Sequence, residues 1–342
     1  MKQCHNLFPN KEAFIIFALY IILFVFQGVF VTASKSENGG YDYNTTLVVS
    51  LSELLKLCAS ALLYTFKKES NKPHIIKAIC LNSRLLMLYF IPSLLYCFYN
   101  NLAFINLSHY DPTSYYILLQ LRVVLTALLF QFLFKKKLTF MQWISLAILT
   151  VGCMIKNFDA ASIQSKGDTD LWSQVFNIYF LSINFQNFCS CLAGTYNEYL
   201  LKGSNVDIFL QNVFMYLDSV ICNFFILMFK GELGTIVNDF SSLADTFVIL
   251  IIVNSAVVGI VTSFFLKNLN SILKTYASAL ELVITAVVCY LLFHILITGF
   301  TVLSICLVSI AVAMYFKNPV SNAKVNTTDS KDKAPLLEVT TA

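Results

Sequence analysis

Seven charged side chains stand within stretches of the chain that are otherwise apolar. Three are cations and four are acids, namely Lys56, Arg122, Lys274, Glu53, Glu198, Asp218 and Glu281. Because an ionisable group in an apolar segment is costly, each of them is a candidate for a functional site. The chemistry open to such groups is the binding and selection of an ion.

Two of the cations point to the binding of a multiply charged anion. Arg122 stands at helical spacing from Tyr115 and Thr126, and Lys274 stands at helical spacing from Ser278. A guanidinium offers phosphate oxygens a planar fork and an ammonium offers a point charge, so a phosphate or diphosphate suits the two together. The alternative, that both cations neutralise the acids named above without a ligand, stays open.

Amide and phenol groups in the same stretches could recognise what the anion is attached to. A base edge needs donors and acceptors, and a base face needs an aromatic ring. The alternative is that these groups form hydrogen bonds between helices. The candidate substrate-binding residues are Arg122, Lys274, Asn100, Asn101, Tyr115, Asn212, Tyr216 and Glu198.

The remaining cation has an acid beside it. Glu53 and Lys56 are three residues apart, so on a helix they share a face and can pair. We predict a structural ion pair or a gate at this position.

The apolar stretches that carry these residues are long enough to cross a bilayer. The chain has 342 residues, of which 58% are apolar and 12% charged, whereas about 25% are charged in an average soluble protein. A spanning helix needs about 20 apolar residues. Candidate spans are 14–33, 46–66, 85–107, 113–134, 138–155, 173–200, 207–229, 246–266, 271–292 and 295–316. We therefore predict an all-α membrane protein with ten transmembrane helices and no secretory signal peptide.

An internal repeat divides these helices into two halves. Residues 121–130 align with 280–289 at a shift of 159 residues, with Leu, Val, Thr and Ala coinciding. The fourth helix then overlies the ninth, as two inverted five-helix repeats require, and such proteins bind substrate near the midplane between halves. The predicted domains are a cytosolic N-terminus (1–13), a first repeat (14–155), a luminal loop (156–172), a second repeat (173–316) and a disordered cytosolic tail (317–342).

The distribution of Lys and Arg predicts the orientation. With ten spans, the side that holds both termini carries sixteen of them, and the other side carries only Lys35, Lys156, Lys166 and Lys230. Since cytosolic loops are enriched in Lys and Arg, we expect both termini in the cytosol.

Several motifs in this order identify a family resemblance. They are Ser52-Glu-Leu-Leu-Lys-Leu57, Tyr99-Asn-Asn-Leu102, Asp111-Pro-Thr-Ser-Tyr115, Gln120-Leu-Arg122, Ala193-Gly-Thr-Tyr-Asn-Glu-Tyr-Leu-Leu-Lys-Gly203, Gln211-Asn212 and Asn270-Ser-Ile-Leu-Lys-Thr-Tyr-Ala277. The sequence resembles the nucleotide-sugar transporters of the drug/metabolite transporter superfamily, within the subgroup of UDP-galactose, UDP-N-acetylglucosamine and CMP-sialic acid carriers.

The resemblance implies a Golgi antiporter that imports UDP-galactose into the lumen in exchange for UMP. It assigns the phosphates to Arg122 and Lys274, and the nucleoside to Asn100 or Asn101, Asn212 and Tyr216. Members of the family usually carry Lys where this chain has Arg122. The alternatives are a carrier of another UDP-sugar or of CMP-sialic acid, and a membrane scaffold that does not transport.

Other classes of function have weaker signals. Asp168-Thr-Asp170 has the form of a glycosyltransferase metal-binding pair but stands in a short predicted loop, and Cys189 and Cys191 lack a second ligand pair. We therefore expect no enzyme activity, metal, cofactor or nucleic-acid partner. The stretch Asp332-Lys-Ala-Pro-Leu-Leu337 has the form of a dileucine signal for sorting adaptors, and the oligomeric state is left open, a homodimer included.

Overall fold

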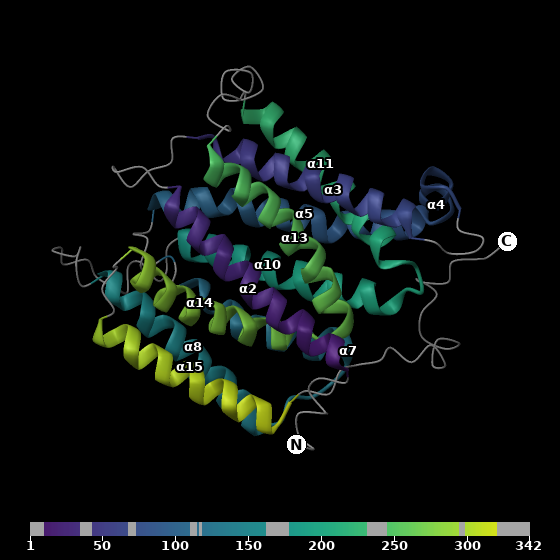
Figure 1. The fold of residues 1–342 in the computed structure, drawn as a ribbon. Coiled ribbons are helices and arrows are strands. Elements are labelled where there is room, and N and C mark those ends of the chain that lie inside the picture. Colours follow the sequence, from purple (N-terminus) through teal and green to yellow (C-terminus); the bar gives the residue numbers. More distant parts are fainter. Residues whose placement is uncertain are drawn as a thin grey trace. The chain divides into compact units, whose positions relative to one another are not determined.

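The computed structural model describes residues 10–34, 43–67, 73–109, 115, 118–161, 178–230, 245–293 and 298–319, and these contain helices and no strands. The predicted all-α class is therefore confirmed for this part of the chain. The helices, labelled as in Figure 1, are α2 (Lys11–Ala33), α3 (Thr45–Phe66), α4 (Ile75–Leu81), α5 (Ser83–His109), α7 (Arg122–Phe134), α8 (Phe140–Ala161), α10 (Ile178–Gly203), α11 (Ile208–Lys230), α13 (Thr246–Asn268), α14 (Ser271–Phe293) and α15 (Gly299–Lys317).

Helix length and composition make the chain a multi-pass membrane protein. Within the described residues, six helices are each long and apolar enough to cross a bilayer: α2, α3, α11, α13, α14 and α15. The bent pair α4 and α5 passes the same test as one unit, and α7 and α8 contain shorter apolar helices. α10 is 26 residues long but contains several amides.

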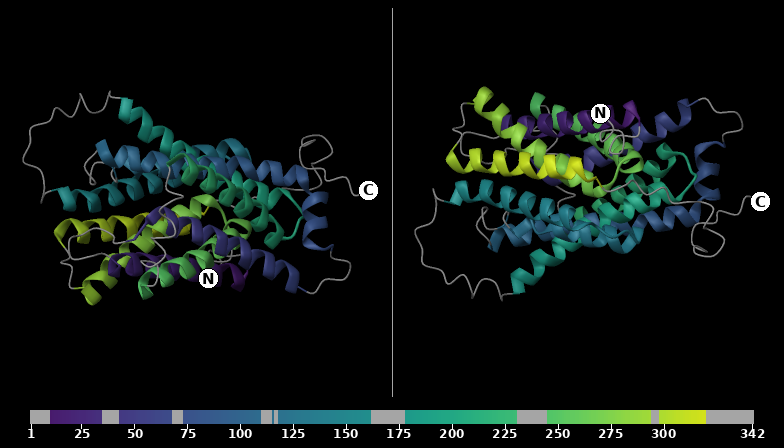
Figure 2. Two further views of the ribbon diagram at one scale, coloured as in Figure 1. Left: turned by 90° about the horizontal axis from the view of Figure 1, so that it is seen from above. Right: turned by 90° about the horizontal axis from the view of Figure 1, so that it is seen from below.

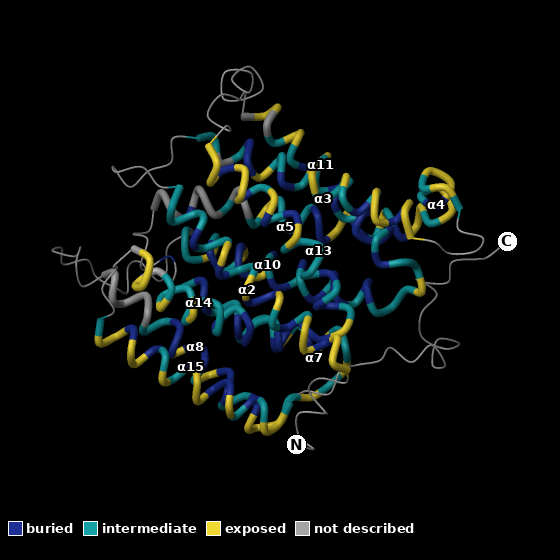
Figure 3. Tube along the Cα trace, in the orientation of Figure 1, coloured by how far each residue is buried: buried dark blue, intermediate teal, exposed yellow. Residues whose placement is uncertain are grey.

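The burial pattern also fits a lipid solvent. Large apolar side chains such as Phe132 and Phe229 are 80% and 89% exposed, whereas Gln186, Asn187 and Gln211 are 0% exposed. Figure 3 shows exposed and buried positions alternating along α15. In water this distribution would be unfavourable, but in a bilayer apolar groups face lipid and polar groups pair inside the bundle.

The helices form two compact units, and each unit takes residues from both halves of the sequence. Unit 1 consists of Met1–Phe17, Leu95–Tyr196 and Leu269–Asn322, and unit 2 consists of Ala18–Leu94, Asn197–Asn268 and Ala323–Ala342. Unit 1 therefore contains α7, α8, α14, α15 and parts of α5 and α10, and unit 2 contains α3, α4, α11, α13 and most of α2.

In unit 1, α8 and α15 pack along each other, as Figures 1 and 2 show. Gly152 of α8 allows this approach, because a Cβ there would lie 3.1 Å from Leu307 Cβ and 3.3 Å from Val308. The Ser304 hydroxyl donates to the Gly152 carbonyl at 2.7 Å. Small residues and serine hydroxyls are typical of helix contacts in membranes, where the backbones must approach closely.

A buried hydrogen-bonded group joins three helices of unit 1. The Ser145 hydroxyl of α8 donates to the Ala311 carbonyl of α15 at 2.8 Å and lies 2.6 Å from the Tyr276 hydroxyl of α14. Since the single Ser145 proton goes to the carbonyl, the Tyr276 hydroxyl is the donor in the second bond. The Tyr276 ring stacks on Tyr315 with centroids 4.2 Å apart.

In unit 2, α3 packs against both α11 and α13. The Tyr89 hydroxyl of α5 donates to Gln211 Oε1 at 2.7 Å. The Asn254 amide donates to Gln27 Oε1 at 2.7 Å, and Lys67 pairs with Asp207 at 2.6 Å. Side-chain amides thus link this unit's helices, as expected for the interior of a membrane bundle.

Three predicted boundaries are wrong. The helix expected at 113–134 is interrupted, since residues 120 and 121 form a turn and α7 begins at Arg122. The stretch 67–84, expected to be a loop, contains α4, and α8 runs to Ala161 instead of ending at residue 155. An apolar pattern reports which residues avoid water, but a turn inside an apolar run keeps the same composition.

The buried group around Ser145 gives a test of the fold. We expect Ser145→Ala to lower the free energy of unfolding by about 1–3 kcal/mol, because it leaves the buried Tyr276 hydroxyl without its acceptor. Tyr276→Phe should cost about 1 kcal/mol or less, because Ser145 keeps its carbonyl acceptor. Melting temperatures of both variants in detergent check the order, and a larger loss for Tyr276→Phe would contradict the assigned donor.

Candidate functional site

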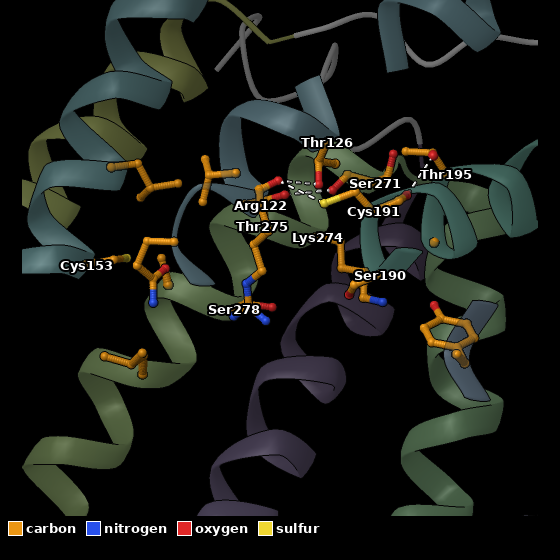
Figure 4. Close-up of a pocket in the computed structure, with 17 residues that line it drawn as sticks. Arg122, Thr126, Cys153, Ser190, Cys191, Thr195, Ser271, Lys274, Thr275 and Ser278 are labelled. Carbon is orange, nitrogen blue, oxygen red and sulfur yellow. Dashed lines mark hydrogen bonds between the residues drawn. The ribbon is translucent and has the colours of Figure 1, made fainter. Parts of the chain in front are cut away.

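Unit 1 contains a cavity of about 160 Å³ that is lined by two cations (Figure 4). Arg122 comes from α7 and Lys274 from α14, and both line the cavity with side chains of α5, α8 and α10. Among the described residues that line the cavity, none carries a carboxylate. Seven lining residues carry hydroxyls, namely Tyr96, Thr126, Ser190, Thr195, Ser271, Thr275 and Ser278. A site with two positive charges and many donors is suited to an anion with several oxygens.

Side chains of α10 determine where Arg122 lies. The Asn187 amide donates to the Leu118 carbonyl at 3.0 Å, and the Cys191 thiol donates to the Arg122 carbonyl at 3.2 Å. The Thr126 hydroxyl donates to the same Arg122 carbonyl at 2.8 Å. The Leu118 carbonyl also accepts from the Leu121 backbone N–H at 3.2 Å. α10 thus adds side-chain bonds on both sides of the turn before α7, as polar side chains do between membrane helices.

α14 places Lys274 in its first turn. The Asn270 side-chain oxygen accepts from the Leu273 backbone N–H at 2.7 Å, and the Asn270 carbonyl accepts from the Lys274 N–H at 3.0 Å. Arg122 and Ser271, the first residues of α7 and α14, both line the cavity. The positive ends of two helix dipoles therefore add to the charges of the two cations.

Tyr115, a predicted site residue, is not among the residues that line this cavity. Its side chain is 4% exposed, and its hydroxyl accepts from Gln186 Nε2 at 2.8 Å. Gln186 in turn accepts from the Asn106 amide at 2.7 Å. The interruption before α7 explains the difference, because Tyr115 and Arg122 no longer share one continuous helix face.

Among the described residues, the acids Glu53, Glu198 and Glu281 are not part of the cavity wall. Glu198 pairs with Lys202 at 2.6 Å, four residues along α10 and in unit 2. Glu53 pairs with Lys56 at 2.7 Å in the same unit. Glu281, one of the acids within the apolar stretches, is not among the described lining residues, and it accepts from the Thr285 hydroxyl at 3.4 Å.

Unit 2 holds a second polar group around Lys56. The ammonium lies 5.6 Å from the centre of the Tyr216 ring, within the range of a cation–π interaction. Gly259 of α13 provides the room, because a Cβ there would lie 2.8 Å from Lys56 Cδ and 2.8 Å from the Tyr216 hydroxyl. Asn212, one turn before Tyr216, is 1% exposed. Asn212 and Tyr216 therefore lie in unit 2, and their binding roles stay predictions.

Some predicted residues lie outside what the structure describes. The side chains of Asn100 and Asn101 fall there, as do the Asp168–Asp170 stretch, the tail from residue 320 and its Asp332–Leu337 motif. Conversely, the roles of Gln186, Gly259 and Lys202 were not predicted. Only Lys202 had a visible signal, its spacing of four residues from Glu198 on a predicted helix.

Asn187 gives a test of how Arg122 is positioned. We expect Asn187→Leu to reduce substrate exchange by about tenfold, since a small displacement of a binding group is costly. The matched control is Asn184→Leu on the same helix, because the Asn184 amide bonds only to the Phe180 carbonyl of α10 itself among the described contacts. Exchange rates in liposomes measure both, and equal rates would show that α10 does not position Arg122.

Gly259 tests the arrangement around Lys56. Gly259→Ala should displace the flexible end of Lys56 and lower exchange about tenfold, with only a small loss of thermal stability. Gly299→Ala is the control, since nothing lies within 4 Å of a Cβ at that position. Unchanged exchange in Gly259→Ala would mean that the position of Lys56 over Tyr216 is not needed.

Fold and cavity together define a multi-pass α-helical membrane protein with a cationic interior site. The chain belongs to the nucleotide-sugar transporter family, whose family model, described as nucleotide-sugar transporter, matches residues 10–316. The family resemblance predicted from the motifs is thereby confirmed. This is a family of transporters, so the membership decides against the membrane glycosyltransferase alternative.

Relatives of known name agree with this membership. The chain is 47% identical to the UDP-galactose transporter senju of Drosophila melanogaster, over 97% of this chain and 96% of the relative. It is 32% identical to CMP-sialic acid transporter 1 of Oryza sativa subsp. japonica, over 89% and 94%. A protein of known crystal structure, 12% identical, has the same fold, with a TM-score of 0.63 over 89% of this chain and 96% of that one.

Proposed function

We propose that this protein imports UDP-galactose into the Golgi lumen in exchange for UMP, by alternating access of two inverted five-helix repeats. The observation that carries the proposal is the cavity of unit 1, whose described lining residues include the cations Arg122 and Lys274 and seven side chains with hydroxyls. Inside a membrane protein such a site binds poorly to neutral molecules and favours a diphosphate or monophosphate, whose oxygens accept charge-assisted hydrogen bonds.

The composition of the units supports the repeat. The predicted repeat pairs the fourth helix with the ninth and the fifth with the tenth. These correspond to α7 with α14 and α8 with α15, and all four belong to unit 1. Each half of the sequence thus contributes one cation to the cavity, which is what two repeats related by a pseudo-two-fold axis would supply. The ten-span count belongs to the same proposal.

Substrate and orientation rest on separate arguments. The choice of UDP-galactose rests on the 47% identity to a UDP-galactose transporter, and the choice of a cytosolic location for both termini rests on the bias of Lys and Arg. CMP-sialic acid is the second candidate, because a 32% identical relative carries that name. Homodimer formation and adaptor binding remain predictions of the sequence.

The two cations give the direct test. In liposomes preloaded with UMP, we expect uptake of labelled UDP-galactose to fall by tenfold or more in Arg122→Ala and Lys274→Ala, since a hydrogen bond to a charged group contributes about 1.5–3 kcal/mol. Arg122→Lys should retain part of the activity because it keeps the charge but not the fork. The control is Lys317→Ala, an exposed lysine at the end of α15.

Each alternative has its own outcome in this assay. Uptake driven by CMP and not by UMP would replace UDP-galactose with a CMP-sugar. No uptake of any nucleotide sugar by the unmutated protein would support the scaffold alternative and reject transport.

A further inference from the structure

We propose that α4 lies in the plane of the membrane surface and binds the headgroup region of an anionic leaflet. α4 and α5 meet at a bend of 85°. α5 alone has 27 residues, about 40 Å at 1.5 Å per residue, which exceeds the hydrocarbon thickness of about 30 Å. α5 can therefore cross the bilayer without α4, and a helix turned by 85° from a crossing helix runs along the surface.

The corner between the two helices is held by hydrogen bonds. The Asn82 side-chain amide donates to the Ala78 carbonyl at 2.8 Å, and the Asn82 carbonyl accepts from the Leu86 N–H at 3.1 Å. On the other side, the Tyr64 hydroxyl of α3 donates to the Pro73 carbonyl at 3.2 Å. Both ends of α4 are thus attached to unit 2, and Figure 1 shows α4 across the end of α5.

The outward face of α4 has the composition of a membrane-surface helix. Ala78 is 0% exposed and faces the protein, whereas Ile76 and Leu81 are 66% and 54% exposed. Lys77 lies between these two apolar residues and is exposed, as is Arg84 at the start of α5. Exposed apolar side chains with basic residues among them suit the boundary between acyl chains and anionic headgroups, where the Lys stem lies along lipid and its charge reaches the phosphates.

The side of the membrane follows from the proposed orientation, in which this end of α3 and α5 faces the cytosol. Anionic lipids are concentrated in cytosolic leaflets and attract basic residues near the surface. The proposal rests on that orientation and not on the identity of the substrate. A failure of UDP-galactose exchange would therefore leave the lipid measurements below unchanged.

Tryptophan fluorescence of the full chain in liposomes tests the proposal. Trp143 and Trp172, the two native tryptophans, are replaced by Phe, and a single Trp is introduced as Ile76→Trp or Leu81→Trp. Asn205→Trp is the control, an exposed position in the connection between α10 and α11 of the same unit. Lipids brominated in the acyl chains should quench the α4 tryptophans severalfold more than the control, and acrylamide in water should show the reverse order.

A comparison of anionic with zwitterionic lipids distinguishes binding to anionic headgroups from contact with lipid in general. Brominated phosphatidylserine should quench Ile76→Trp more than brominated phosphatidylcholine does, and Lys77→Gln should remove much of that difference. Amide hydrogen exchange provides a measurement that needs no tryptophan substitution. In the unmutated protein, the amides of residues 75–81 should exchange more slowly in liposomes with phosphatidylserine than in liposomes without it.

Three outcomes would overturn the proposal. Strong acrylamide quenching with weak bromolipid quenching would place α4 in water. Weak quenching by both agents that rises when the protein is diluted would show that a second copy of the chain covers this face. Equal amide exchange in both kinds of liposome would show that anionic headgroups do not bind there.

Discussion

The site depends on one constraint, that backbone groups inside a bilayer must be bonded within the protein. The chain interrupts its helix at a turn of residues 120 and 121, where the Leu118 carbonyl accepts from the Leu121 N–H at 3.2 Å. The Asn187 amide adds a second bond to the Leu118 carbonyl at 3.0 Å, and the Cys191 thiol bonds to the Arg122 carbonyl at 3.2 Å. Both bonds attach this turn to α10, and α7 begins at Arg122 with its positive end at the cavity.

The charges around the cavity indicate which kind of ligand it can bind. Two cations and two helix N-termini of like sign in a low-dielectric region repel each other unless an anion lies between them. Among the described residues that line the cavity there is no carboxylate. Glu53 and Glu198 pair with neighbouring lysines of unit 2. The described wall therefore combines two cations with hydroxyl donors, a lining that suits a phosphorylated ligand.

The sequence alone predicted the all-α class, because composition reports the solvent, and it singled out Arg122 and Lys274, which both line the cavity. It missed the break before α7 and the short helix α4. Side-chain hydrogen bonds lie at both places, from Asn187 and Cys191 in one case and from Asn82 and Tyr64 in the other, and an apolar pattern carries no information about such bonds. Tyr115, a predicted substrate-binding residue, bonds through its hydroxyl to Gln186 and is not among the described residues that line the cavity. The ion pair of Glu198 and Lys202 could have been predicted from the sequence, since the two residues are four apart on a predicted helix.

The Arg at position 122 sets the geometry with which the cavity can hold an anion. A guanidinium presents planar donors that match two phosphate oxygens at once, whereas an ammonium is a compact point charge. Arg122 and Lys274 therefore bring two different kinds of donor to one cavity, with the hydroxyls of Thr126, Ser271 and Ser278 also in its wall. Because the fork of Arg122 has a fixed plane, the position of the α7 start relative to α10 decides which oxygens it can reach.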